Sequence, residues 1–522
     1  MPTESEIKLV MTPPLLSRLR RHPLLKGLKH GRGSTHHLVS VYYDTPDHKL
    51  FKRNLALRVR QVGAKRIQTL KAQNGGVAGH TNRDEWEREL IGDQPVLDQV
   101  ADPKVSEVLE DIRHGRRRLA PIFATDVKRT AWTLKLPDGS EVALALDQGE
   151  VKADGLSAPI CEAEMELVSG EPESMFDLAT KLHGDIPFQL GNRSKSSRGY
   201  DMIAGRQPEP SKSAALELQP EMTTEAAFKA IARNCLAHLE ANEQSACVGT
   251  DPEGIHQMRV ALRRLRSAFS TFRAALPRQA AGDLETELRW LGPELGPARD
   301  WDVFRAETLA PIRQSLPEES GPAVLDERAA TRREAAYEQA RAAIGSPRYT
   351  ELKLKLAAWL VASDWNAIMP EAEAALLCTP VADFAAAVLR RRHRKLRKKG
   401  GKHRDLTLPE LHELRIRAKK MRYTADFFRR FYPRKAVKEY IAAVAALQDS
   451  LGGINDAAAG RLRLAELGVD DDAVTMRAEA LVLGWLAGRV EEQRRHFDDV
   501  WRHFAHAAPF WGARATAEHH GD

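Results

Sequence analysis

Strand-like segments in the first 200 residues place charged side chains at alternate positions, with apolar side chains between them. In the opening run, Glu4, Glu6 and Lys8 alternate with Ile7 and Leu9. Successive side chains of a β-strand point to opposite faces, so this spacing puts every charge on one face. The pattern recurs in the segments 58–60, 69–71, 83–87 and 162–166. We therefore predict several strands that share one charged face and one apolar face.

The charged face constrains what these strands can enclose. If they close into a barrel, either the charged or the apolar set looks inward, and a helix over residues 173–183 can cover the outside. A charged lumen must hold water, metal and an anionic ligand, because each unpaired buried ion costs several kcal/mol. Carboxylates suit Mg²⁺ or Mn²⁺, and Lys and Arg neutralise phosphates. A charged barrel of this kind indicates metal-assisted phosphoryl transfer. The alternative is an open sheet whose charged face carries only surface ion pairs.

The chain of 522 residues is too long for one core, and its pattern changes once. The period is two up to about residue 205 and helical from about residue 224. Between them, residues 207–213 have the Pro-rich polar composition of a linker. We predict an α+β protein of two domains, a β domain over 1–203 and an all-α domain over 222–508. A linker over 204–221 joins them and a tail covers 509–522.

Several protein classes are excluded by composition. No apolar stretch approaches the roughly 20 residues of a membrane span, and the first residues form an acidic strand instead of a signal peptide. We expect a cytoplasmic protein with no membrane partner. The four cysteines lack Cys-x-x-Cys spacing, which argues against a zinc site or a disulfide framework. The sequence has no Gly-x-x-x-x-Gly-Lys-Ser/Thr segment, so a P-loop enzyme is excluded.

The helical half contains an internal repeat. Residues 256–266 align without gaps on residues 412–422, at an offset of 156. Leu295-Gly296 and Asp300 match Leu451-Gly452 and Asp456 at the same offset. A repeat of this length indicates that one helical unit was duplicated. We therefore predict pseudo-two-fold symmetry in this domain.

Each copy of the repeat carries a stripe of cations at i, i+3, i+7 and i+10, which is one face of an α-helix. The stripes are His256, Arg259, Arg263 and Arg266, and His412, Arg415, Lys419 and Arg422. A separate apolar stripe should pack into the bundle, so we expect the cations on the outside. Each stripe spans roughly 15 Å, which suits a linear polyanion.

The charge around the second stripe supports a polyanionic ligand. Residues 381–435 contain 19 Lys or Arg against 5 Asp or Glu, whereas the counterpart of the run 390–399, around 234–243, is nearly neutral. The basic surface should therefore be lopsided. Nucleic acid is an alternative to polyphosphate, because phosphate contacts alone do not distinguish them. The scarcity of aromatic residues among the cations argues against it.

The order of these motifs resembles a known family. Glu4-x-Glu6-x-Lys8, Tyr43-Asp44-Thr45, Leu57-Arg58-Val59-Arg60, Thr69-Leu70-Lys71, Arg83-x-Glu85-x-Glu87 and Glu162-x-Glu164-x-Glu166 look like the CYTH family, or triphosphate tunnel metalloenzymes. The duplicated His-x-x-Arg helices resemble the CHAD domain, which is associated with inorganic polyphosphate. A CYTH domain followed by a CHAD domain is similar to the bacterial CYTH–CHAD inorganic triphosphatases.

The resemblance implies an eight-stranded antiparallel tunnel that hydrolyses tripolyphosphate to pyrophosphate and phosphate with Mg²⁺ or Mn²⁺. It implies that the metal ligands are Glu4, Glu6, Glu162 and Glu164. The implied catalytic residues are Glu4, Glu6, Lys8, Glu85 and Glu87. The implied phosphate ligands are Lys8, Arg58, Arg60, Lys71, Arg83, Arg129 and Lys195, with Arg193 as an alternative to Lys195. Asp147 is a further charged position without a defined role.

The resemblance also implies that the two cationic stripes bind long-chain polyphosphate. Two alternatives remain for the function. The same tunnel occurs in enzymes for organic triphosphates, so thiamine triphosphate hydrolysis or cyclisation of ATP is one. The other is a non-enzymatic protein that binds polyphosphate with both domains and associates with polyphosphate granules.

Overall fold

The computed structural model describes residues 3–72, 78–98, 100, 102–115, 118–362, 365, 369–468 and 472–512. Within these ranges the side chains of residues 3, 4, 81–83 and 372 are not described. The chain forms two compact units. The first contains Met1–Pro208 and Gly345–Ser363, and the second contains Glu209–Ile344 and Asp364–Asp522. None of the helices in the described part of the chain combines the length and the apolarity that crossing a bilayer requires.

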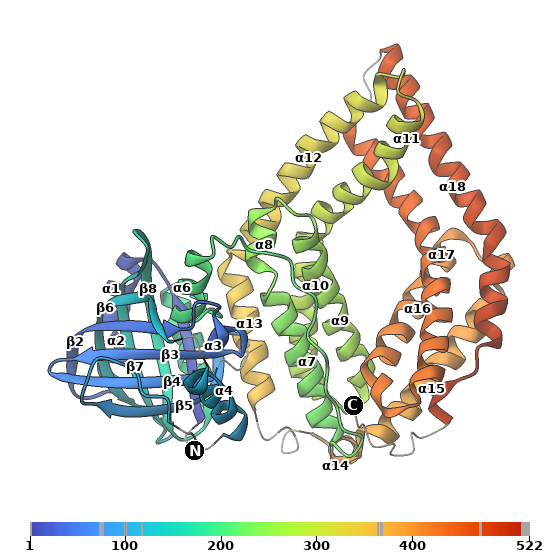
Figure 1. Cartoon of the computed structure of the whole chain (residues 1–522). Helices are drawn as coiled ribbons and strands as arrows, with labels where there is room; N and C mark the ends of the chain where they lie inside the picture. The colour runs from blue at the N-terminus through green and yellow to red at the C-terminus, as the bar shows by residue number, and fades with distance from the viewer. Residues whose placement is uncertain are drawn as a thin grey trace. The chain divides into compact units, whose positions relative to one another are not determined.

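The first unit is built around a single antiparallel sheet (Figure 1). Its strands are β1 (Thr3–Val10), β2 (Lys29–Asp44), β3 (Leu55–Val62), β4 (Lys65–Ala72), β5 (His80–Leu90), β6 (Ala120–Lys135), β7 (Glu141–Ala153), β8 (Leu156–Ser169) and β9 (Gln189–Leu190). Their spatial order is β5-β4-β3-β2-β6-β7-β8-β1-β9. Because β1 also pairs with β5, strands β1 to β8 close into a barrel. The predicted eight-stranded barrel is therefore confirmed, with the two-residue strand β9 added beside β1.

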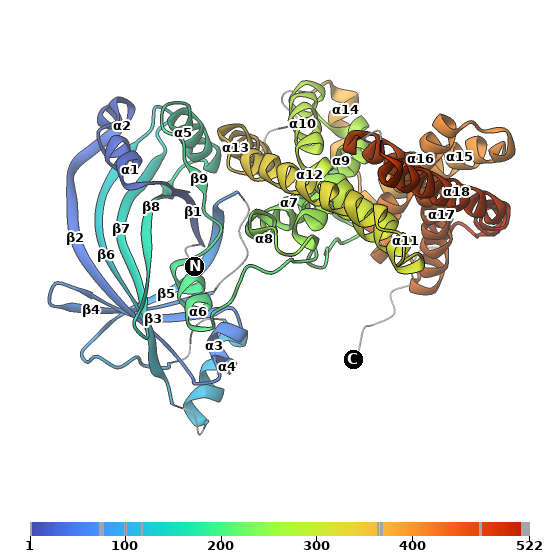
Figure 2. The same cartoon turned by 90° about the horizontal axis from the view of Figure 1, so that it is seen from above.

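Figure 2 shows the long strands β2, β6, β7 and β8 side by side in that order. The helices of this unit are α1 (Pro13–Arg20), α2 (Pro23–Leu28), α3 (Lys49–Lys52), α4 (Pro103–His114), α5 (Pro172–Asp185), α6 (Lys195–Ile203) and α13 (Pro347–Val361). They supply apolar side chains to the outer face of the barrel. Val105, Leu109 and Ile112 of α4, for example, pack against Leu57 and Leu70 of the sheet. The alternation seen in the sequence thus turns the apolar set outward and the charged set inward.

Helix α13 belongs to this first unit although it lies within residues 222–508, which we predicted to be the helical domain. It packs against α5 and β9, and His183 Nε2 of α5 lies 3.0 Å from the Pro347 carbonyl oxygen. Tyr349, Leu356 and Leu360 of α13 are buried. The periodicity of α13 is that of any buried helix, so the sequence pattern could not assign it to the β domain.

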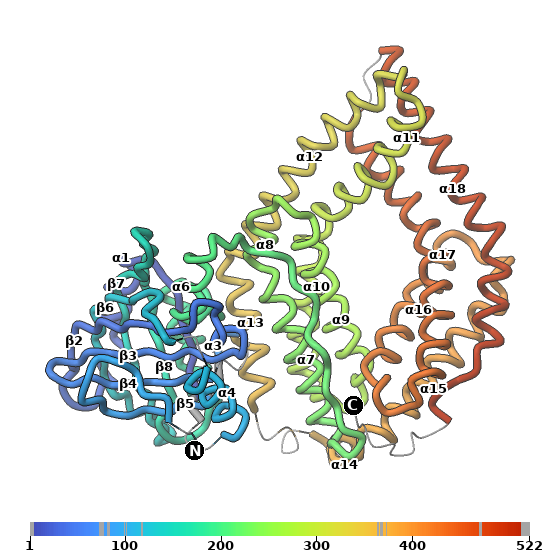
Figure 3. The backbone as a smooth tube through the Cα atoms, viewed as in Figure 1, coloured from blue at the N-terminus to red at the C-terminus, as the bar shows by residue number. Residues whose placement is uncertain are grey.

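The second unit is all helical, as predicted. Its α-helices are α7 (Thr224–Glu240), α8 (Glu243–Val248), α9 (Glu253–Phe272), α10 (Arg278–Val303), α11 (Ala310–Ser315), α12 (Gly321–Ile344), α14 (Glu371–Cys378), α15 (Val381–Gly400), α16 (Leu408–Phe428), α17 (Arg434–Leu467) and α18 (Ala473–His506). The two longest, α17 and α18, run alongside each other (Figure 3).

The sequence repeat is also a structural repeat. Helices α9 and α10 are joined by a 3₁₀ turn at Arg273–Ala275, and α16 and α17 are joined by the equivalent turn at Arg429–Phe431. The apolar stripes of α9 and α16 are buried, as predicted, and they meet where the Phe272 and Phe428 rings lie 5.9 Å apart. This packing places the two cationic stripes in the same part of the unit.

Candidate functional site

The barrel encloses a cavity of about 880 Å³, which we call the barrel cavity. Its wall carries both signs of charge, and most of the predicted site residues line it. Those residues are Glu6, Lys8, Arg58, Arg60, Lys71, Glu85, Glu87, Arg129, Glu164 and Lys195. Strand register brings them together, because Lys8 lies opposite Glu164 across β1 and β8, and Lys71 lies opposite Glu85 across β4 and β5. Cross-strand neighbours of opposite charge then pair within the cavity.

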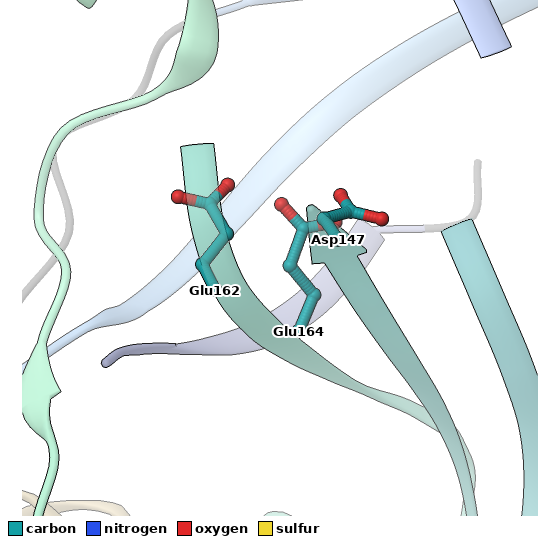
Figure 4. A group of neighbouring side chains, drawn as sticks. All are labelled: Asp147, Glu162 and Glu164. Carbon is teal, nitrogen blue, oxygen red and sulfur yellow. The ribbon is translucent and has the colours of Figure 1, made fainter. Parts of the chain in front are cut away.

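Three carboxylates form a close acidic group among the described residues of the barrel. Asp147 of β7 and Glu162 and Glu164 of β8 each offer an oxygen, and these oxygens lie within 4.8 Å of one another (Figure 4). We call them the carboxylate trio. Asp147 and Glu162 are almost fully buried. Three oxygen donors at this separation, two of them from buried side chains, fit a hard divalent cation such as Mg²⁺ or Mn²⁺.

Buried cations neutralise the carboxylate trio. The Lys195 ammonium lies 2.6 Å from a Glu162 oxygen and 2.7 Å from oxygens of Asp147 and Glu164. Arg129 donates two hydrogen bonds of 2.7 and 2.6 Å to Asp147 and also pairs with Glu164. The Lys8 ammonium lies 3.3 Å from Glu164 and 3.6 Å from Glu6. The trio is therefore ionic and compensated by amines and a guanidinium.

The pKa values follow from this arrangement. Burial by itself raises the pKa of Glu164, but Lys195, Arg129 and Lys8 outweigh it and hold this pKa well below its usual value. The pKa of Asp147 is lowered in the same way, chiefly by Lys195 acting against burial. Burial lowers the pKa of Lys8, and the carboxylates of Glu164, Glu162 and Glu6 more than reverse the effect. Both signs of charge thus persist at neutral pH inside the barrel.

The opposite wall of the barrel cavity carries cations with fewer partners. Lys71 pairs with Glu85 at 2.7 Å, and Glu87 accepts a hydrogen bond of 2.9 Å from the Thr69 hydroxyl. Arg60 donates to the Ser40 hydroxyl at 3.1 Å and forms no ion pair with any described residue. Burial, followed by repulsion from Arg58 and Arg129, lowers the pKa of Arg60 to about 9. A buried guanidinium in this state favours an anion beside it.

Two predicted site residues lie partly outside the described part of the chain. The backbones of Glu4 and Arg83 pair across β1 and β5, but their side chains are not described.

The structure distinguishes the two cations that the sequence offered near the last strand, Lys195 and Arg193. The Lys195 side chain reaches the carboxylate trio, whereas Arg193 pairs with Asp201 of α6.

The sequence analysis missed several residues of this site. Asp147 and Glu166 were named as charged positions without a defined role, and Tyr42, Ser194 and Ser196 were not singled out. Glu166, Tyr42, Ser194 and Ser196 all line the barrel cavity. Asp147 lies opposite both Arg129 and Glu162 in the sheet. This register was the signal that was available, because pairing β6 to β7 around the turn at Pro137-Asp138-Gly139 aligns Arg129 with Asp147.

A buried network fixes the helix that carries Lys195. The Asp44 carboxylate accepts hydrogen bonds from the backbone nitrogens of Leu50 and Phe51 at 2.9 and 3.0 Å, and from the Tyr200 hydroxyl at 2.7 Å. Asp44 is fully buried and Tyr200 nearly so. The network ties α3 and α6 to the end of β2, so that the first residue of α6, Lys195, extends into the barrel cavity.

The second unit contains a separate basic cavity of about 430 Å³, which we call the central cavity. Six of the eight predicted stripe residues line it, namely His256, Arg259, Arg263, Arg415, Lys419 and Arg422. These six side chains are half-buried and line this cavity, so the prediction that the stripes lie on the outside holds only for Arg266 and His412, which are exposed. The reason is tertiary: the pairing of α9 with α16 brings the two faces together. Arg266 lines an adjoining hollow, and His412 is exposed and hydrogen-bonded to Asn455 at 2.5 Å.

The two halves of the central cavity are equivalent in detail. Arg259 lies 3.5 Å from Asp300, and Arg415 lies 3.5 Å from Asp456, which are the pairs related by the offset of 156. Lys419 has no ion pair among the described residues. Burial, followed by repulsion from Arg415 and Arg263, lowers the pKa of Lys419 to about 7. The central cavity is therefore a concentrated positive site with few compensating carboxylates.

Comparison with known proteins assigns both units. The CYTH domain model matches residues 2–200, and the CHAD domain model matches residues 230–465. The chain is 35% identical over 164 residues to an inorganic triphosphatase of Haemophilus influenzae, a match that covers 31% of this chain and 45% of that protein. The chain thus spans less than half of that relative.

Two further matches extend over the helical unit. An uncharacterized protein of Mycobacterium tuberculosis is 27% identical over 424 residues, which cover 75% of this chain and 76% of that protein. The crystal structure of a CHAD domain from the plant Ricinus communis is 33% identical, with a TM-score of 0.50, and the match covers 57% of this chain and 97% of that domain. The resemblance found in the sequence is confirmed, and the chain belongs to the proteins that join a CYTH domain to a CHAD domain.

Proposed function

We propose that the barrel cavity is the active site of a metal-dependent hydrolase that converts inorganic triphosphate to pyrophosphate and phosphate. The observation that carries this proposal is that Glu164 of the carboxylate trio lines one cavity together with six described Lys or Arg side chains, while oxygens of Asp147 and Glu162 lie within 4.8 Å of a Glu164 oxygen. Phosphoryl transfer requires such positioning and charge neutralisation. The name of the Haemophilus influenzae relative, an inorganic triphosphatase, supports the choice of substrate.

The residues divide by charge. The carboxylate trio and Glu6 would hold Mg²⁺ or Mn²⁺, and we expect Glu4 to take part from the same strand. Such an ion supplies charge for the phosphate oxygens and lowers the pKa of a water molecule. In this structure the Lys195 ammonium lies among the trio. That ammonium would be repelled by a divalent cation bound there and would turn toward a substrate phosphate. Arg58, Arg60 and Lys71 on the opposite wall would bind the remaining phosphates.

The lining of the cavity bears on the alternative substrates. Tyr42 is the one aromatic side chain among the described residues that line it, and it is 5% exposed. Thiamine triphosphate and ATP each carry a ring that a binding site commonly stacks on aromatic side chains. The lining therefore favours inorganic triphosphate over both, and a purely binding role would leave the carboxylate trio without a purpose.

Phosphate release tests this proposal. We expect the full chain with Mg²⁺ or Mn²⁺ to release phosphate from tripolyphosphate faster than from thiamine triphosphate or ATP. Glu4→Ala/Glu6→Ala should lower the rate by about 100-fold or more, because two oxygen ligands are lost. Val10→Ala, an exposed apolar change on the same strand, is the control and should keep the rate. Faster turnover of an organic triphosphate, or equal rates for the double variant, would refute the assignment.

We further propose that the central cavity binds polyphosphate. Its two equivalent cation sets and the low pKa of Lys419 support a multivalent anion that contacts both halves. Arg259→Ala/Arg415→Ala should weaken the binding of long-chain polyphosphate by about 10-fold and reduce its dependence on salt, since two phosphate contacts are lost. Arg494→Ala/Arg495→Ala on α18 removes the same charge outside the lining of the cavity and should have little effect. Unchanged binding in the first variant would contradict the proposal.

A further inference from the structure

One further hollow adjoins the central cavity, and a second adjoins that hollow, in series along α9 and α16. Arg263 and Lys419 line both the central cavity and a hollow of about 330 Å³. Arg273 and Lys420 line both that hollow and a third of about 910 Å³. We call the third hollow the basic groove. These shared lining residues place the three hollows next to one another.

The cations of the basic groove are held in place by the fold. Arg392 of α15 donates hydrogen bonds to the Lys420 carbonyl oxygen at 2.9 Å and to the Ser270 hydroxyl at 3.2 Å. This guanidinium therefore joins α15 to α16 and α9. Burial, followed by repulsion from Arg391, lowers the pKa of Arg392 to about 10. Burial and the nearby guanidinium groups, with Arg392 first, also lower the pKa of Lys420.

The carboxylates of the basic groove do not neutralise all of its cations. Glu285 pairs with Arg273 at 2.9 Å, and Glu413 pairs with Arg417 at 2.6 Å. Among the described residues, Arg391, Lys395 and Lys420 have no carboxylate partner. Like charges crowded without counter-charges destabilise one another, and an anion that contacts several of them relieves that repulsion.

The basic groove is not repeated in the other half of the pseudo-symmetric unit. The N-caps of α7 and α15 are Thr223 and Pro380, so these two helices are related by an offset of 157. At that offset Arg391, Arg392 and Lys395 correspond to Asn234, Cys235 and His238, and burial lowers the pKa of His238. The series of cation-lined hollows therefore extends from the central cavity toward α15, and the other half of the repeat has no matching set of cations at these positions.

We propose that the basic groove continues the central cavity into one track for a linear polyphosphate, so that this unit prefers chains too long for the central cavity alone. The proposal rests on the proposed binding of polyphosphate in the central cavity. Along α9, the path from Arg259 to Arg273 covers roughly 20 Å, beyond which the basic groove extends the track toward α15.

The aromatic side chains on these walls favour polyphosphate over a single-stranded nucleic acid. Phe269 and Phe304 are buried, so they offer no face to a base. The Tyr423 hydroxyl contacts Arg263 at 3.4 Å, and the Arg422 guanidinium lies over the Tyr423 ring. Binding of single strands normally uses a series of free aromatic platforms, one for each of several bases.

The test compares two pairs of exposed cations on α15 in the full chain. Arg391→Ala/Lys395→Ala changes the basic groove, and Arg394→Ala/Lys398→Ala removes the same charge from the same helix outside its lining. The first variant should bind long-chain polyphosphate about 10-fold more weakly, with a smaller salt dependence. The control should stay within about twofold of wild type. Short polyphosphates should compete poorly against the long chain on wild type and relatively better on the first variant.

Each other outcome has a distinct meaning. Equal weakening by both pairs, or none by either, would refute the basic groove while leaving binding in the central cavity intact. Single-stranded RNA that competes as well as polyphosphate at equal phosphate concentration would refute the choice of ligand. Failure of wild type to bind polyphosphate at all would instead overturn the proposed function of the central cavity, and the inference with it.

Discussion

At the scale of single residues, the two cavities treat buried charge in opposite ways. In the barrel cavity Lys8 and Lys195 are surrounded by carboxylates, which raise the pKa of both side chains against the effect of burial. In the central cavity Lys419 is surrounded mainly by guanidinium groups, and its pKa falls to about 7. The first arrangement keeps Lys8 and Lys195 charged before a ligand arrives. The second leaves a lysine whose charge depends on the ligand.

This difference predicts a pH dependence for the binding of polyphosphate. Below about pH 7 Lys419 is already protonated, and above it the side chain must take up a proton when the anion binds, so affinity should fall as the pH rises. Arg415, Arg263, Asp456 and Arg259 also face this side chain. Burial lowers the pKa of His256, which lines the same cavity, from its ordinary value. Lys419→Arg should keep its charge and abolish most of the change. The test is to measure the dissociation constant for polyphosphate from about pH 6.5 to about pH 9 for wild type and Lys419→Arg. An equal loss of affinity by the two proteins would contradict the role of Lys419.

At the scale of elements, α6 determines where Lys195 lies, and the Asp44 network determines where α6 lies. The Tyr200 hydroxyl is the contact that α6 makes with this carboxylate, and burial, followed by the charge of Asp44, raises the pKa of that hydroxyl strongly. The ring also stacks on Phe51 with centroids 4.1 Å apart. Removing the hydroxyl leaves this packing in place and loosens the polar anchor alone.

Tyr200→Phe should therefore lower the free energy of unfolding by about 2 kcal/mol, the usual scale for a buried hydrogen bond to a charged group. It should also raise the KM for tripolyphosphate several-fold, because Lys195 is held less firmly. Tyr43→Phe is the matched control, since that hydroxyl donates a longer, partly buried hydrogen bond of 3.3 Å to the uncharged Asp93 carbonyl oxygen. Urea unfolding and steady-state kinetics measure both effects. Equal losses in the two variants would contradict the role of Asp44.

The elements also show what a sequence can predict. A period of two gave the strands and their charged faces, because that pattern is local to each strand. The role of Asp147 was missed because it depends on two hairpin registers, which align Asp147 with Arg129 and Glu162, whereas the sequence analysis treated each strand separately. The cationic stripes were expected on the outside because helical periodicity does not show which helix packs against which. The pairing of α9 with α16 is a contact between residues far apart in the sequence. The place of α13 on the first unit was missed for the same reason.

At the scale of the whole molecule, each unit has its own charged cavity with its own chemistry. The barrel cavity combines carboxylates with cations, as phosphoryl transfer requires, whereas the central cavity is mainly cationic and suits binding. Changes in one cavity should therefore leave the other function intact. The central claim is that the carboxylate trio holds the metal on which triphosphate hydrolysis depends.

The most direct test measures phosphate release from tripolyphosphate by the full chain in the presence of Mg²⁺ or Mn²⁺. The trio variant carries Asp147→Asn/Glu164→Gln, and the control carries Arg259→Ala/Arg415→Ala in the central cavity. The trio variant keeps the shape of both side chains and removes two charged ligands, so we predict a rate lower by about 100-fold or more, with polyphosphate binding unchanged. The control should hydrolyse tripolyphosphate at the wild-type rate. Undiminished, metal-dependent hydrolysis by the trio variant would contradict the account.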